Sequence, residues 1–438
     1  MLKRIFTIAL LTGAGQVFII FALKHISQQS SPEQIKAIGQ IDSLVLFIMN
    51  IIAMGLQPAA MRNLALTDNW EQEYRKTQSA RFTLSIFLTL LTLLAFTDHY
   101  YLAFLLAPLL ALSGDYALYG RGSPVKGAVI AFVRAVFPFA IVILLPGNEN
   151  TGLQWFYLAA LITSYFITDL FISAFLHQTF IPVFDLKSLK KYISTLSLGL
   201  VSLSLYFIGM GVLLVAQYFY PSPVLATAFV GLKFYVIFKG VLRIIQQAFL
   251  KEMQKDKVCL KIDQLSSLLG LSFLTFVLFF PDTFTRFLFG EKYIPDKNYF
   301  ILVSIAAFVY SMFSSFTTRA MLDKKDNSYA VITTIAALLT LVACFLLSFF
   351  NTTAQAIGLS ILTGEISFAI GMLWLMKRKQ LFFERIFFIA ANIPLTIIPL
   401  SAMLFLDDNI IVFLAAAVIF AGVLFLVHRK RFSFFDIS

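Results

Sequence analysis

Long apolar runs recur along the whole of this chain. A helix needs about 20 predominantly apolar residues to cross the hydrocarbon core of a bilayer, and hydropathy predicts fourteen such spans here. A mean hydropathy of +0.86 with 13% charged residues excludes a soluble globular protein of 438 residues. We therefore expect an all-α polytopic membrane protein with about 14 transmembrane helices. The predicted spans are roughly 5–23, 37–60, 80–97, 101–119, 126–146, 152–176, 192–219, 223–246, 263–283, 298–318, 328–349, 354–376, 386–406 and 409–427.

The basic residues predict the orientation of these spans. If the N-terminus is cytoplasmic, 26 of the 34 Lys and Arg residues fall in inner segments, five in outer segments and three within spans. The first apolar run follows Lys3 and Arg4 but lacks a small-residue cleavage site, so we interpret it as an uncleaved first helix. Both termini are therefore expected in the cytoplasm. The net charge of +11 follows this topology and gives no reason to expect nucleic acid.

The spans group as six, six and two. We expect an N-terminal six-helix lobe over 1–176, a cytoplasmic linker over 177–191 and a C-terminal six-helix lobe over 192–376. Residues 377–438 would form two additional helices and a cytoplasmic tail. Two parallel six-helix halves around a central cavity are a common plan among transporters.

The span that begins at Ser222 carries cations at membrane depth. Lys233, Lys239 and Arg243 lie on one arc of about 120° of a helix. A lysine in hydrocarbon costs at least about 2.5–3.5 kcal/mol by insertion scales, so it normally faces a partner or a wet cavity. Lys239 and Arg243 could instead extend to the cytoplasmic surface, whereas Lys233 is too deep for that and is expected to face the cavity.

Three further charges are expected inside the membrane. Arg134 and Asp169 lie at equal depth in consecutive helices, so they could pair. Glu365 matches the depth of Lys233, so a Lys233–Glu365 contact is expected in the second lobe. Each pair admits two interpretations, a brace between helices or an ion-responsive element.

The sequence offers no sign of enzyme chemistry. It lacks a metalloprotease helix motif, a phosphate-binding glycine loop and a glycine-flanked nucleophilic serine. Its four histidines do not cluster, and its two cysteines, Cys259 and Cys344, form no disulfide framework. We expect no metal, no cofactor and no catalytic residue. Helices can bend at Gly55 with Pro58, at Gly209 with Gly211, and at Pro394 with Pro399, but close packing is the favoured explanation for any single glycine.

Two stretches resemble the polysaccharide (O-antigen, Wzx-type) flippases of the multidrug/oligosaccharidyl-lipid/polysaccharide (MOP) exporter superfamily. Residues 38–66, IGQIDSLVLFIMNIIAMGLQPAAMRNLAL, resemble the second helix of that family. Residues 281–293, PDTFTRFLFGEKY, resemble its proline-to-LFG-x-x-Y segment after the ninth helix. With the number of spans, the resemblance extends over 1–376, and some members of the family carry two further helices.

The resemblance implies an alternating-access carrier in the bacterial inner membrane. Such carriers move undecaprenyl-diphosphate-linked oligosaccharides to the outer leaflet for polysaccharide biosynthesis, with membrane lipids and other polysaccharide assembly proteins as further partners. It implies that cavity cations receive the diphosphate. From their depth in the membrane, we further expect Glu365 and Asp169 to respond to a coupling proton or sodium ion. The positions that match a substrate-binding role are Arg62, Arg134, Lys233, Lys239 and Arg243.

Two alternatives remain open on the sequence. A MATE-like drug or metabolite antiporter has the same fold but would favour an acidic, aromatic cavity for cationic cargo. A polysaccharide polymerase or glycosyltransferase would need a large outer loop or acidic residues in the first outer loop, which offers only Glu33.

Overall fold

Every element of the part of the chain that the structure describes is helical. The computed structural model describes residues 2–66, 68–95, 105–144, 152–248, 253, 255–281, 296–376 and 379–403. This confirms the predicted all-α membrane fold. In chain order the elements are α1 (Leu2–Gln29), α2 (Pro32–Ala53), α3 (Leu56–Leu66), α4 (Trp70–Ala95), α6 (Ala107–Leu112), α7 (Asp115–Gly120), α8 (Pro124–Leu144), α9 (Leu153–Leu176), the 3-10 turn η2 (Leu186–Leu189), α10 (Lys190–Phe207), α11 (Val212–Ala216), α12 (Ser222–Ala248), α13 (Asp256–Phe279), α15 (Lys297–Met312), α16 (Ser314–Leu322), α17 (Asp326–Ser348), α18 (Ala354–Met376) and α19 (Lys379–Met403).

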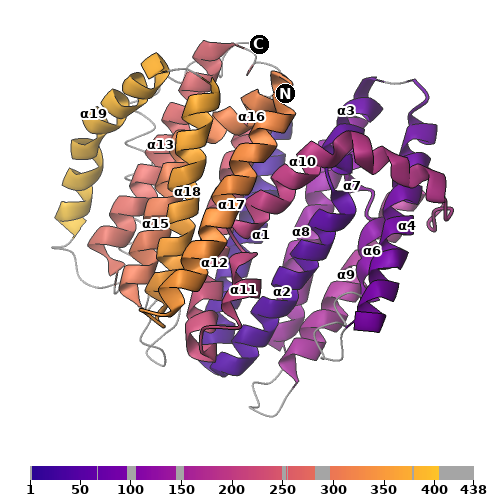
Figure 1. Ribbon diagram of the computed structural model, residues 1–438, viewed down its shortest axis with the longest axis horizontal. Coiled ribbons are helices and arrows are strands. Elements are labelled where there is room, and N and C mark those ends of the chain that lie inside the picture. Colours follow the sequence, from indigo (N-terminus) through magenta and orange to yellow (C-terminus); the bar gives the residue numbers. More distant parts are fainter. Residues whose placement is uncertain are drawn as a thin grey trace.

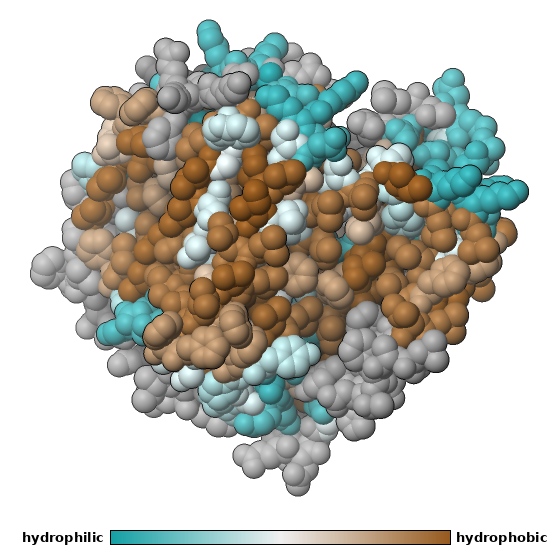
Figure 2. All heavy atoms as spheres, in the orientation of Figure 1, coloured by the Kyte–Doolittle hydropathy of each residue, from teal (hydrophilic) through white to brown (hydrophobic). Residues whose placement is uncertain are grey.

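The long helices have the composition of membrane spans. Seven helices in the described segments are long and apolar enough to cross a bilayer, and α15 with α16, bent by 41°, makes an eighth if the pair is one span. Figure 2 shows a broad hydrophobic surface across the middle of the molecule, with most hydrophilic side chains above it in this view and a smaller group below it. The predicted span 409–427 and the family-like segment 282–293 lie outside the described residues.

Several predicted spans are interrupted helices, and glycine accounts for the first interruption. The predicted span 37–60 divides into α2 and α3 at Met54 and Gly55, whose φ angles are 31° and 77°. A Cβ on Gly55 would lie 2.4 Å from the carbonyl oxygen of Thr195 in α10, so this turn needs glycine both for its backbone and for its space. The predicted span 192–219 likewise divides into α10 and α11 around Gly209 and Gly211. By contrast, α19 continues through Pro394 and Pro399.

Two long inner loops of the prediction are largely helical. Residues 61–79 were expected to be a loop, yet α3 continues to Leu66 and α4 begins at Trp70. In the same way α13 begins at Asp256 inside the expected loop 247–262. The expectation was wrong here because hydropathy detects only the apolar part of a helix, whereas the backbone hydrogen bonding continues into polar turns beyond it.

The helices of 1–176 and those of 192–376 pack mostly among themselves. In Figure 1, α3, α4, α6 and α9 lie on one side, α15, α17, α18 and α19 on the other, with α2 and α12 between. The main contact between the two regions is α2 against α12 and α10, and α19 packs on α13. For brevity 1–176 is called the first half and 192–376 the second half; that these move as separate lobes stays a prediction.

Candidate functional site

The expected partner of Lys233 is wrong, because this lysine contacts α2 and not α18. Its Nζ lies 2.5 Å from Asp42 Oδ2, and the Tyr157 hydroxyl donates to Asp42 Oδ1 at 2.9 Å. The side chains of Lys233 and Asp42 are 12% and 13% exposed. Lys233 therefore faces the contact between the halves, away from lipid as expected, but the Lys233–Glu365 pair does not form.

Asp42 was missed although the sequence carried a signal for it. It lies ten residues after Pro32, where α2 begins, and Lys233 lies eleven residues after Ser222, where α12 begins. On the predicted topology both helices enter from the same side, so the two charges share one depth. Depth alone cannot tell Asp42 from Glu365, because the choice depends on which helix faces α12.

Glu365 pairs instead with Lys239, six residues farther along α12. The Lys239 Nζ lies 2.6 Å from Glu365 Oε1, which also accepts the Tyr235 hydroxyl. The lysine lies 4.4 Å from the ring of Tyr235 and 4.3 Å from that of Tyr310. Glu365 is fully buried, and its second oxygen has no hydrogen-bond partner among the described residues. A buried carboxylate with one unused oxygen can accept a proton or a small cation there.

Arg243 completes the cationic arc of α12 and differs from the two lysines. Its side chain is exposed, and it forms no ion pair with any residue that the structure describes. Arg243 is thus an accessible cation on α12, the helix that packs against both halves. The side chain of Arg62 in α3 lies outside the described residues.

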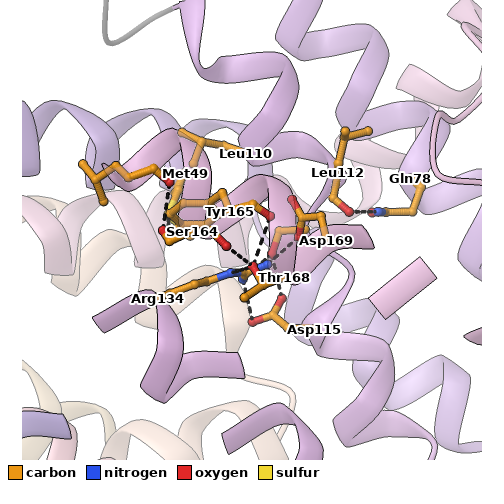
Figure 3. Close-up of polar contacts among 12 residues, drawn as sticks. Met49, Gln78, Leu110, Leu112, Asp115, Arg134, Ser164, Tyr165, Thr168 and Asp169 are labelled. Carbon is orange, nitrogen blue, oxygen red and sulfur yellow. Dashed lines mark hydrogen bonds and ion pairs between the residues drawn. The ribbon is translucent and has the colours of Figure 1, made fainter. Parts of the chain in front are cut away.

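The predicted Arg134–Asp169 pair is present in the first half. The Arg134 guanidinium donates to Asp169, to Thr168 Oγ1 at 2.8 Å and to Ser113 Oγ at 2.7 Å (Figure 3). It also lies 3.8 Å from Asp115 and 4.5 Å from the ring of Tyr165. Two carboxylates therefore lie beside one guanidinium whose side chain is 9% exposed, and the second oxygen of Asp169 is without a hydrogen-bond partner in the described chain.

Two arginines that the charge distribution assigns to inner segments are buried against other helices. Arg81 of α4 is 1% exposed and donates to Gln78 Oε1 and to the carbonyl oxygens of Leu110 and Ser113. Arg385 of α19 is fully buried and pairs with Asp263 of α13. Both lie near the ends of predicted spans, where hydropathy cannot separate a solvated arginine from a buried one. Arg81 adds a second buried cation to the first half.

The site has a definite chemical character. Lys233, Lys239 and Arg134 each meet a carboxylate, so in this conformation their charges are balanced, and Arg243 adds an accessible positive charge. No group of three or more His, Cys, Asp and Glu residues that could hold a metal occurs in the segments described here. Such a site can bind an anion at Arg243. Deeper along α12, an anion can take the place of the carboxylate that now pairs with Lys239 or Lys233.

Comparisons with known proteins show the fold. No protein-family model and no curated protein sequence matches the chain. The solved structure of the lipid II flippase MurJ, in an inward closed conformation, matches with a TM-score of 0.70 at 13% identity, over 95% of this chain and 98% of that one. An inward-facing multidrug resistance MATE family transporter of the MOP superfamily matches with a TM-score of 0.60 at 13% identity, over 85% of this chain and 98% of that one. The structure of a eukaryotic MATE transporter matches with a TM-score of 0.56 at 12% identity, over 87% of this chain and 96% of that one. The chain therefore has the fold of the MOP transporters.

Proposed function

We propose that this protein is a Wzx-type flippase that moves undecaprenyl-diphosphate-linked oligosaccharide from the inner to the outer leaflet of the bacterial inner membrane. The observation that carries the proposal is the cationic arc of α12, Lys233, Lys239 and Arg243, which lies between the halves of a MOP fold. The two halves act as lobes that alternate access to this arc, with both termini in the cytoplasm.

The chemistry of the cargo fits this arc. A diphosphate cannot cross hydrocarbon unaided, because its charges would lose their hydration. Arg243, exposed and with no ion pair to the described residues, receives the headgroup first. Lys239 and Lys233 lie at successively greater depth along the same helix, and Arg62 and Arg134 complete the proposed cationic set. A guanidinium suits this first contact because its fork of donors matches a phosphate.

The buried acids give the carrier a way to reset. Glu365 and Asp169 each hold a cation with one oxygen and leave the other without a hydrogen-bond partner in the described chain. We assign these unused oxygens to a coupling proton or sodium ion. If Glu365 serves this role, Glu365→Gln changes the dependence of glycan export on external pH or sodium. If it only braces α12 against α18, the variant loses stability and keeps the wild-type dependence.

A MATE-like antiporter is the second candidate, and one observation favours it. Asp42, Asp169 and Glu365 place three carboxylates beside aromatic rings in the interior, a composition that suits cationic cargo. Under that function, Arg243 would repel the cargo, and replacing it would leave transport of cationic drugs unchanged or improved. The absence of enzyme motifs and the likeness to transporters support a non-enzymatic function over a polymerase or glycosyltransferase.

The decisive experiment is export of surface glycan from a strain that lacks the chromosomal copy. Arg243→Gln is expected to lower export at wild-type protein levels, because the first cation met by the headgroup is lost. Lys257→Gln is the matched control, since Lys257 in α13 is also an exposed cation near the expected cytoplasmic end. Full glycan production in the deletion strain, or equal effects of the two variants, would contradict the proposal.

A further inference from the structure

The face of α2 that meets the second half is lined with polar contacts. These contacts lie among apolar ones, since Ile38 of α2 packs in one hydrophobic cluster with Phe229 and Val230 of α12. The contacts join Lys36 Nζ to Ser222 Oγ at 3.4 Å, Gln40 to Gln217, Asp42 to Lys233, Ser43 Oγ to the Met210 carbonyl at 3.5 Å, and the Tyr206 hydroxyl to the Ser43 carbonyl at 2.6 Å.

Within this set Asp42–Lys233 is the only ion pair. Another ion pair in the described chain, Glu73–Lys191 at 2.9 Å, also joins the first half to residues beyond it. Its members are 24–25% exposed and lie beside the covalent linker, so it can persist whatever the two halves do. Asp42–Lys233 lies deeper, between the rings of Phe139 and Phe229, 5.8 Å and 5.5 Å from the lysine Nζ. These apolar rings and the low exposure of both side chains limit water at this pair, which strengthens its electrostatic attraction.

We propose that Asp42 takes the place of the cargo's anion in the empty carrier and holds α2 against α12 until an anionic headgroup displaces it from Lys233. The identity of that headgroup rests on the proposed function. The separation leaves each charge with a partner. Tyr157 of α9 donates to Asp42 at 2.9 Å, so the carboxylate keeps a donor within the first half. Lys233, on α12, leaves with the phosphate oxygens as its new acceptors.

The Asp42–Lys233 pair explains why Lys233, which is needed to bind the anion of the cargo, is neutralised by a carboxylate in the interior of the empty carrier. An unpaired lysine at this depth would be expensive in the empty carrier. A carboxylate from the other half removes that cost and closes the two helices at the end that bears Lys36 and Ser222. A cargo without negative charge has nothing to offer Lys233 in exchange and leaves the halves closed. Asp42 is thus a specificity-determining residue that acts through Lys233.

The test measures closure directly in the full-length protein. Cysteines at Lys36 and Ser222 are joined in nanodiscs by a short bis-methanethiosulfonate reagent, and the cross-linking rate reports how often this end is closed. Cys259 and Cys344 are buried, and single-cysteine variants measure their background. Asp42→Asn is expected to slow the reaction about tenfold, because the pair no longer favours the closed state. Glu73→Gln, the matched control, is expected to leave the rate unchanged.

The probe for displacement is farnesyl diphosphate, with farnesol as its uncharged control. Farnesyl diphosphate should slow cross-linking of the wild type and have no further effect on Asp42→Asn, whereas farnesol should change neither. If Asp42→Asn fails to fold, Asp42→Asn/Lys233→Gln leaves no unpaired charge and should show the same slow rate. An unchanged rate in a folded variant that lacks the pair, or an equal effect of farnesol, would overturn the proposal.

Two outcomes separate this inference from the proposed function. Asp42→Asn and farnesyl diphosphate could each slow cross-linking while the deletion strain keeps normal glycans. In that case the displacement of Asp42 from Lys233 is supported and the proposed function fails. If glycan export requires the protein while Asp42→Asn cross-links at the wild-type rate, the proposed function holds and the displacement fails.

Discussion

Replacing Lys239 is expected to destabilise the protein more than replacing Glu365, although the two residues form one ion pair. Glu365 is fully buried, so in Lys239→Met its carboxylate would keep only the Tyr235 hydroxyl as donor. Lys239 is 17% exposed, so in Glu365→Gln its ammonium can turn toward water. Because Glu365 is more deeply buried than Lys239, we expect Lys239→Met to lower the free energy of unfolding more than Glu365→Gln does.

The magnitude follows from the geometry. At 2.6 Å the attraction is about 6 kcal/mol with an effective dielectric constant of about 20. Desolvation offsets much of it, and leaving one partner of a buried pair without the other costs about 3–5 kcal/mol. We expect that cost for Lys239→Met. For Glu365→Gln, where the amide oxygen still accepts from Tyr235, we expect about 1–2 kcal/mol. The double variant, with no charge left to bury, should recover most of the loss.

Thermal unfolding in detergent, followed by size-exclusion chromatography, measures the order of the three variants. The Arg385–Asp263 pair is the control, because both of its members are fully buried. There the order should differ, with Asp263→Asn lowering the unfolding temperature at least as much as Arg385→Met, because Asp263 keeps the Ser315 backbone and hydroxyl donors when the arginine is replaced. The reasoning is refuted if Glu365→Gln unfolds below Lys239→Met, or if the double variant shows the sum of the two single losses.

Two further predictions test the backbone and the topology. Gly55→Ala should destabilise the protein more than Gly122→Ala, since both glycines have positive φ but only a Cβ on Gly55 would meet backbone, at 2.4 Å from the Thr195 carbonyl; equal shifts in unfolding temperature would contradict this. An impermeant thiol reagent applied to intact cells should label single cysteines introduced within 281–297 and miss those within 247–262, as the distribution of Lys and Arg predicts, and the reverse pattern would overturn the orientation.

The sequence by itself determined the features that depend on position along a helix. Apolar length predicted the long apolar helices, and Gly55 and the Gly209–Gly211 pair marked two positions where a helix could be interrupted. Arg134 and Asp169 could also be paired from sequence, because they lie at one depth in helices that a short connection keeps adjacent. In each case the information is local, or concerns neighbours in the chain.

Only the tertiary structure decided which helix faces which. Lys233 and Asp42 are 191 residues apart, and Lys239 and Glu365 are 126 apart, so no connection fixes these neighbours. Depth in the membrane offered Lys233 two acids, and the packing of α12 between α2 and α18 assigned one to each lysine. Arg81 and Arg385 show the same limit at helix ends. Their burial depends on what covers them, and hydropathy along one helix carries no information about its neighbours.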